Sequence, residues 1–194
     1  CTVGRFSSLP RALACSPCGV GTATAVNGSS QCAQCIKGQY QDQQAQAQCK
    51  PCNPGEYNPV PSQALCLPCS PGFYMNHTGA TVCTQCDKGY VQAVGGKSFC
   101  DACTAGKFIN NPGQKACLQC NPGTATNLTA QSACQDCLAG YFQDQPGQQD
   151  RQACSPGTFA QFGRASICLQ CSPGSATATN ASQACTDCLP GFHQ

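Results

Sequence analysis

The sequence has no Trp, one Met and few charged residues, since Asp, Glu, Lys and Arg together make up 9% of its 194 residues. Its formal net charge is +2 and the basic residues are scattered. That excludes the clustered positive surface that nucleic acids and acidic lipids require. No apolar run is long enough to span a membrane. Large aliphatic side chains are too sparse for one shared hydrophobic core, so the fold must depend on cross-links or metal.

Side chains suited to catalysis are scarce as well. Glu56 is the only Glu, and the two His residues, His77 and His193, lie far apart in the sequence. The run Gly95-Gly96-Lys97-Ser98 imitates the end of a phosphate-binding loop, but Val91 stands where the first Gly of that motif is required. We therefore expect no enzyme, no catalytic residue and no cofactor.

Cysteine is abundant, at 22 of 194 residues, which is typical of a disulfide scaffold. Cys-x-x-Cys pairs recur every 17 residues, and Cys1 fits as the second member of a truncated pair. The series is broken once, where Arg151 replaces the first Cys of the pair that ends at Cys154. The complete pairs are 15/18, 32/35, 49/52, 66/69, 83/86, 100/103, 117/120, 134/137, 168/171 and 185/188. A fixed period of this kind indicates a tandem array.

We define a module as the 17 residues that begin at the second Cys of a pair, and number the modules 1 to 12 from Cys1 to Cys188. A Gly lies three residues after the first Cys of every module, which indicates positive φ or a close backbone approach. An aromatic side chain usually follows two residues later, as in Tyr57, and we interpret it as a lid over the local cross-link. Turn-forming residues such as those at 110–113 come next. Each module is thus predicted to be a small β-hairpin, with one strand after the Gly and a second leading into the closing Cys.

A longer period of 51 residues groups the modules in threes. Modules 1, 4, 7 and 10 resemble one another, whereas modules 2, 8 and 11 share the sequence GTAT or GSAT from their Gly onward. The sequence predicts one continuous array over residues 1–194, with triplets at roughly 1–51, 52–102, 103–153 and 154–194. The pattern is already under way at Cys1 and no signal peptide is visible, so we expect a piece of a longer chain.

The cysteines could bind zinc or form disulfides, because two Cys-x-x-Cys pairs thirteen residues apart also match certain zinc modules. Two features of the sequence oppose zinc: the spacing is uniform, with no gap between four-ligand units, and the basic residues of a DNA reader are missing. The chain also carries four N-glycosylation sequons, which act only in the secretory pathway, where disulfides form. These begin at Asn27, Asn76, Asn127 and Asn180. We expect disulfides, no metal site and a secreted or cell-surface location, with a thiolate metal store as the alternative.

The module resembles the ephrin-receptor-like cysteine-rich repeat of animal receptors and of many protist and algal surface proteins, flagellar-hair (mastigoneme) proteins among them. It also resembles the smallest module of TNF-receptor cysteine-rich domains, Cys-x2-Gly-x-Tyr-x8-Cys closed by one disulfide. Residues 52–66, CNPGEYNPVPSQALC, match that spacing throughout. The resemblance covers essentially the whole chain and implies a small disulfide-rich fold. It is specific for the module and leaves function open, because such modules occur in receptors, matrix proteins and fibres.

The resemblance implies that each hairpin is closed by its own disulfide. The implied bonds are Cys1–Cys15, Cys18–Cys32, Cys35–Cys49, Cys52–Cys66, Cys69–Cys83, Cys86–Cys100, Cys103–Cys117, Cys120–Cys134, Cys154–Cys168 and Cys171–Cys185. Cys137 and Cys188 are then unpaired. Arg151 stands where the partner of Cys137 is expected, and the partner of Cys188 would lie beyond residue 194. Cys137 would bond another chain, pair with Cys154 or stay reduced. Spacing alone also allows adjacent pairs to bond first to first and second to second.

The sequons fall in modules 2, 5, 8 and 11, which is every third module. Each Asn lies seven or nine residues after the first Cys, at the expected hairpin tip. Three of these modules carry Ala in place of the aromatic, at Ala23, Ala125 and Ala176, and their tips are rich in Ser and Thr. We interpret this phase as an elongated rod with about three modules per turn. N-linked glycans, with room for O-linked ones, would then lie along one face.

Two functions fit these features. The first is a structural component of an extracellular glycosylated filament, flagellar hair, stalk or coat, in which the array is a stiff disulfide-cross-linked rod. Its partners would be other copies of the chain or other filament or surface proteins. The alternative is the ligand-binding ectodomain of a cell-surface receptor. A dedicated ligand site should interrupt the repeat with a module rich in exposed aromatic or charged residues, and the uniform sequence of the modules favours the structural role.

Overall fold

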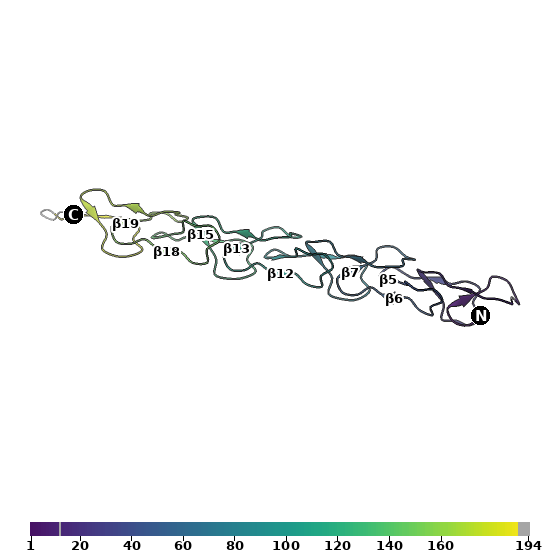
Figure 1. Cartoon of the computed structure of the whole chain (residues 1–194). Helices are drawn as coiled ribbons and strands as arrows, with labels where there is room; N and C mark the ends of the chain where they lie inside the picture. The colour runs from purple at the N-terminus through teal and green to yellow at the C-terminus, as the bar shows by residue number, and fades with distance from the viewer. Residues whose placement is uncertain (12, 190–194) are drawn as a thin grey trace. The chain divides into compact units, whose positions relative to one another are not determined.

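The computed structural model describes residues 1–11 and 13–189. Gly191 and His193, which belong to module 12, lie outside these residues. The chain divides into two compact units, one formed by Cys1–Cys86 with Gln92–Cys100, the other by Asp87–Val91 with the described residues from Asp101 on. In each unit, hairpins follow one another in chain order (Figure 1). The fold is the predicted tandem array of small disulfide-rich hairpin modules.

The described residues form eleven antiparallel hairpins, each built from two strands of two residues. The first strand of each hairpin begins at the residue after the Gly. These first strands are β1 (Arg5–Phe6), β3 (Thr22–Ala23), β5 (Gln39–Tyr40), β7 (Glu56–Tyr57), β9 (Phe73–Tyr74), β11 (Tyr90–Val91), β13 (Lys107–Phe108), β15 (Thr124–Ala125), β17 (Tyr141–Phe142), β19 (Thr158–Phe159) and β21 (Ser175–Ala176). Their partners are β2 (Ser16–Pro17), β4 (Ala33–Gln34), β6 (Lys50–Pro51), β8 (Leu67–Pro68), β10 (Thr84–Gln85), β12 (Asp101–Ala102), β14 (Leu118–Gln119), β16 (Gln135–Asp136), β18 (Gln152–Ala153), β20 (Leu169–Gln170) and β22 (Thr186–Asp187).

The second strand differs from the expectation in its position. It lies between the two cysteines of the following pair and not before the closing Cys. In module 4, Tyr57 is opposite Leu67 and Glu56 is opposite Pro68. The hairpin therefore extends past its disulfide, and the N–H of Cys69 donates to the carbonyl of Gly55 at 2.8 Å. Because the linker is itself a strand, each module is joined to the next by backbone pairing as well as by the chain.

Modules 2 to 10 share two buried side chains: the first Cys, and the residue six positions later, which we call the core position. The core residues are Thr24, Gln41, Asn58, Met75, Gln92, Ile109, Thr126, Gln143 and Ala160. The aromatic next to the core position is only half-buried, as for Tyr57 and Phe108. Tyr57 packs against the cluster of Cys69, Met75 and Ala80 in module 5, so this lid covers the following module rather than only its own.

Three further backbone hydrogen bonds connect consecutive modules. At the junction of modules 3 and 4, the N–H of Gly38 donates to the carbonyl of Asn58 at 2.9 Å. In turn, the N–H of Asn58 donates to Ala80 in module 5 at 2.9 Å, and the N–H of Gly79 donates to the carbonyl of Cys52 at 2.8 Å. The same bonds recur along both units. They satisfy the buried backbone groups that strands of two residues leave unpaired.

In modules 1 to 4 and 6 to 9, the Gly lies against the module after next. We call the residue ten positions after the first Cys the tip position. Gly89 has a φ of 84°, and a Cβ added there would overlap the carbonyl of Ala130, the tip residue of module 8. Gly38 meets the tip residue of module 5, Gly79, in the same way. The sequence predicts positive φ or close approach for this Gly, and these eight modules show both; Gly157 and Gly174 have positive φ but no neighbour within 4 Å of an added Cβ.

The tip position also has positive φ, whether or not the residue is Gly. Non-glycine residues hold φ values between 57° and 63° there. They are Arg11, Ala45, Ser62, Ala130, Arg164 and Ala181. Such residues rarely adopt this conformation. The N–H of the tip residue donates to the carbonyl of the first Cys of the preceding module, as Gly79 does to Cys52, and this bond holds the tip in place.

Candidate functional site

The four sequon asparagines are exposed, in the loops between the paired strands of their modules. Asn76 and Asn127 directly follow the core position, whereas Asn27 and Asn180 lie two residues further along. Sequon and exposure together make each of them a candidate carrier of an N-linked glycan.

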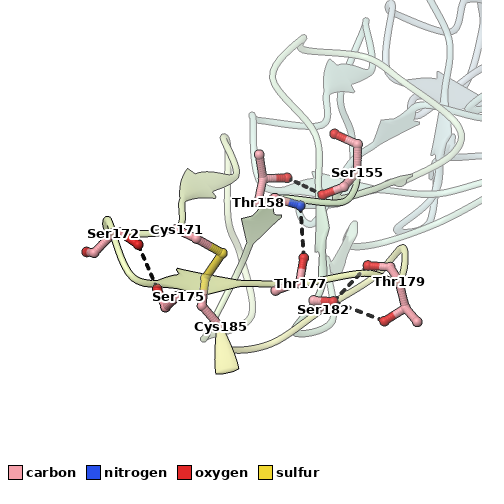
Figure 2. Close-up of a disulfide and its surroundings, with 10 residues drawn as sticks. Ser155, Thr158, Cys171, Ser172, Ser175, Thr177, Thr179, Ser182 and Cys185 are labelled. Atoms are coloured by element: carbon pink, nitrogen blue, oxygen red, sulfur yellow. Dashed lines mark hydrogen bonds between the residues drawn. A yellow bond between two sulfur atoms is a disulfide. The ribbon is translucent and has the colours of Figure 1, made fainter. Parts of the chain in front are cut away.

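The hydroxyl residues of the sequons fall into two structural classes. Thr78 and Thr129, which belong to Asn76 and Asn127, are exposed. Ser182, which belongs to Asn180, is half-buried and donates to the carbonyl of Thr179 at 2.8 Å, beside the Cys171–Cys185 disulfide (Figure 2). Ser29 is held likewise by the carbonyl of Val26 at 2.7 Å. The sequons of modules 5 and 8 therefore present both of their functional side chains to solvent in the folded state.

In the part of the chain that the structure describes, ten disulfides close ten of the hairpins and join the same cysteines as the pairing that the resemblance implies. Their Cα–Cα separations lie between 5.4 and 5.8 Å, in the range that disulfides favour. Within the described residues, no group of three or more His, Cys, Asp or Glu side chains is placed to hold a metal ion. The same residues form no helix that could cross a membrane.

Module 9 lacks a disulfide and keeps its hairpin. Tyr141 and Phe142 of β17 pair with β18 as in the other modules, and the N–H of Cys154 still donates to the carbonyl of Gly140 at 2.9 Å. Cys137 is unpaired and buried, while Cys154 is bonded to Cys168. The structure thus has the thiol of Cys137 enclosed, and not bonded to Cys154.

The environment of Cys137 suppresses ionisation of its thiol. Burial raises the pKa of the Cys137 thiol; the positive charge of Arg151 opposes this shift, and the negative charge of Asp136 adds to it. The guanidinium of Arg151 donates to Oε1 of Gln135 at 2.8 Å. Cys188, the other unpaired Cys, is half-buried at the end of the described residues.

The remaining candidates from the sequence stay apart from one another. His77 is exposed, and its ring lies 3.1 Å from the carbonyl of the neighbouring Thr78. The phosphate-loop imitation at 95–98 forms part of a hairpin loop, in which the N–H of Gly96 donates to the carbonyl of Cys69 at 2.8 Å. That bond engages the N–H of Gly96 at the junction between modules, so this donor is not free to bind a phosphate.

Two surface hollows lie where Ala replaces the aromatic, a feature that the sequence did not reveal. The hollow beside Ala125 has a volume of about 280 Å³ and includes Asn127 and Arg151 in its lining. The hollow beside Ala23 has a volume of about 470 Å³ and includes Val26. The signal in the sequence was the Ala itself, which the repeat pattern marks only as an exception to an aromatic position.

Residues 72–109 match a protein-family model described as tyrosine-protein kinase ephrin type A/B receptor-like. The match runs from the Gly of module 5 to the core residue of module 7. No curated protein matches the chain. The modules on both sides of the matched segment repeat its Cys and Gly spacing, and most repeat its disulfide.

Proposed function

We propose that this ephrin-receptor-like cysteine-rich array is a structural component of an extracellular glycosylated filament, flagellar hair, stalk or coat. The ten disulfides and the ephrin-receptor-like segment indicate an extracellular or cell-surface location. Repeated contacts to the next module and to the one after it support a stiff array, because a module cannot bend without breaking bonds on both sides.

One observation carries the proposal. Modules 4, 7 and 10 each place an exposed Leu opposite an aromatic on their hairpin, and we call these the apolar pairs: Tyr57–Leu67, Phe108–Leu118 and Phe159–Leu169. The three Leu side chains are about half exposed, at 49%, 52% and 53%. The apolar pairs recur every 51 residues, the same period as the sequons, in different modules. Apolar groups repeated in this way suit lateral contact between copies of the chain, and the sugars would lie on other modules.

Electron microscopy of the purified native protein tests this proposal. The native protein should form filaments or lateral bundles. The double variant Leu118→Glu, Leu169→Glu should remain folded with its disulfides intact but should not assemble, because each Glu places a charge in the apolar contact. Thr84→Glu, Thr186→Glu is the matched control, since these exposed residues hold the same strand position in modules 5 and 11.

The control variant should assemble like the native protein. Native protein that stays monomeric at high concentration would contradict a filament role. Equal assembly of the Leu and Thr variants would show that the apolar pairs are not the contact.

The alternative is the ligand-binding ectodomain of a cell-surface receptor. The observation that favours it is the family-model match, whose description names a receptor. A receptor role predicts a monomeric protein that binds a cell-surface or soluble ligand through particular modules. Immobilised native protein that captured no ligand but seeded filaments would separate the two functions.

A further inference from the structure

Three departures from the repeat meet at the junction of modules 8 and 9. Ala125 replaces the aromatic, Arg151 replaces the closing Cys, and Asn127 begins a sequon. All three line the hollow of about 280 Å³, together with Gln135, Gln149 and Asp150. Three residues that hold unrelated positions in the repeat thus line the same hollow.

The hollow exists because a ring is missing. Ala125 of β15 lies opposite Gln135 of β16, in the register where module 7 has Phe108 opposite Leu118. Ala125 lines the hollow but is itself only 1% exposed, so its methyl group offers almost no accessible apolar surface. Most other modules have an aromatic at this position, and here the space is open to a small polar ligand.

The walls of the hollow are polar. Arg151 donates to Oε1 of Gln135 at 2.8 Å, which uses one of the five N–H donors of its guanidinium. Gln149 and Asp150 also line the hollow, and both are residues with polar side chains. Sugar hydroxyls and acetamide groups bind to paired donors and acceptors of this kind. The volume is close to the lower end of ligand pockets, roughly 300 Å³.

We propose that this hollow is the seat of the first sugar residues of the N-linked glycan carried by Asn127. The inference rests on the glycosylation that the proposed function includes. Because Asn127 is on the rim, the sugar is tethered at its binding place, and the effective concentration reaches the millimolar range or above. Weak individual contacts are then sufficient to hold it.

Two other sequons provide comparisons within the same chain. Module 5 keeps its aromatic, Tyr74, and Asn76 holds the same position in that module as Asn127 does in module 8. The hollow beside Ala23 has Val26 in its lining, and Asn27 is not part of it. Asn76 therefore serves as a control for Asn127, because it holds the same position in its module, which has an aromatic in place of the hollow.

The test uses the full chain, secreted from eukaryotic cells that add N-glycans. Native protein is treated with an amidase that releases N-glycans at the Asn, and release is followed at each site by mass spectrometry. The glycan should leave Asn127 about tenfold more slowly than Asn76, because a seated sugar reaches the enzyme only when it leaves the hollow. Denatured and reduced protein should lose both glycans at equal rates.

Ala125→Tyr is the diagnostic variant, because it restores the ring of the repeat and fills the hollow. It should bring release at Asn127 to the rate at Asn76. Ala23→Tyr fills the other hollow and should leave the slow release at Asn127 unchanged. Arg151→Gln removes the charged donors and should give an intermediate rate.

The outcomes separate this inference from the proposed function. Sequons without sugar at all four sites would overturn the glycosylated filament and the seat together. Sugars at Asn76 and Asn127 that are released equally fast would overturn the seat alone. Slow release at Asn127 that persists in Ala125→Tyr would also overturn it, because the ring and the sugar cannot occupy one space.

Discussion

Positive φ and close approach to another backbone both constrain Gly89, whereas only positive φ constrains Gly96. Substitutions at these two residues can therefore separate the two effects. Gly89 has positive φ and meets the carbonyl of Ala130. Gly96 also has positive φ, at 74°, but its nearest neighbour beyond its own surroundings is the side chain of Pro68, at an ordinary 3.6 Å from an added Cβ. The pair isolates the effect of close approach from that of backbone conformation.

Gly89→Ala should destabilise its module by about 2–5 kcal/mol, the sum of about 1–2 kcal/mol for the left-handed conformation and about 1–3 kcal/mol for overlap with a fixed backbone. Gly96→Ala should show only the first of these costs. Amide hydrogen exchange at Ala130, whose N–H donates to Cys103 at 2.8 Å, measures the local effect. If the two variants lose equal stability, the Gly is explained by its φ alone.

Cys137 should resist alkylation in the native protein. Its thiol is buried and its pKa is raised, so the reactive thiolate is rare at pH 8. Alkylation without reduction should label Cys137 only after denaturation, and mass spectrometry should assign the label. Arg151→Gln should make native labelling slower still, because the charge that lowers the pKa is gone. In Arg151→Cys the label should disappear, since Cys137 gains a partner.

The same thiol makes stability depend on pH in one direction. Its pKa is higher in the folded than in the unfolded chain, whose thiol has a pKa near 9.0. The unfolded state therefore loses its proton first, and the stabilising contribution, complete below pH 9, declines as pH rises toward the folded pKa. The variant Cys137→Ala should lack this decline in denaturant titrations. A decline of equal size in that variant would assign the effect to other groups.

At the scale of the hairpin, the side chain of a buried Gln joins the two sides of the loop by hydrogen bonds. In module 9, Nε2 of Gln143 donates to the carbonyl of Asp150 at 2.6 Å, and its Oε1 accepts the N–H of Gln145 at 3.0 Å. Gln41 makes the equivalent bonds in module 3, to Gln48 and Gln43. Module 3 has a disulfide as well and module 9 does not, so the two modules form a matched pair.

Gln143→Met and Gln41→Met should each leave two backbone groups without partners, at about 1–3 kcal/mol per group. The loop of module 9 should open much further, because the disulfide that remains in module 3 contributes roughly 3 kcal/mol for a loop of this length. Amide exchange at the tip residues Gly147 and Ala45 reports the two loops. Equal exchange at both tips would mean that the disulfide adds nothing to the loop that Gln holds.

The hairpins show what a repeat pattern can predict and what it cannot. Gly and Cys recur as single residue types, so their positions predicted the module, the positive φ and the close approach. The core position holds Thr, Gln, Asn, Met, Ile or Ala, a variety that hides its burial from a pattern search. The second strand was misplaced because paired strands were expected to end at the disulfide. The hollow at Ala125 does not follow from the repeat pattern, because modules 8 and 9 both contribute to its lining.

Across the described residues of each unit, consecutive modules are joined by the same kinds of backbone hydrogen bond, so these modules should be interchangeable. Deleting residues 35–51 removes module 3 and leaves Gly21 facing the tip of module 5, Gly79, in place of Ser62 of module 4. The shortened protein should form nine disulfides, each within its own module. Non-reducing mass spectrometry counts them.

Deletion of residues 40–47 is the control, because it keeps Cys35 and Cys49 but removes the tip. It should expose the Gly residues that face this loop, and amide exchange at Gly21 should rise, since its N–H donates to Gln41. Mispaired cysteines in the 35–51 deletion, or unchanged exchange in the control, would contradict the equivalence of the modules. The sequence-based expectation of about three modules per turn, with glycans on one face, stays a prediction that a density map of filaments can check.

The contact between a Gly and the module after next affects the order in which contacts form while the chain is being synthesised. A module on a growing chain receives its last contact only when two further modules, or 34 residues, have been made. At about 5–20 residues per second, that delay is about 2–7 s. When it begins, both cysteines of the hairpin are already present and lie 14 residues apart in sequence, whereas the cysteines of the next two modules are added only in the course of it. The order of synthesis thereby favours pairing within a module over pairing with later modules.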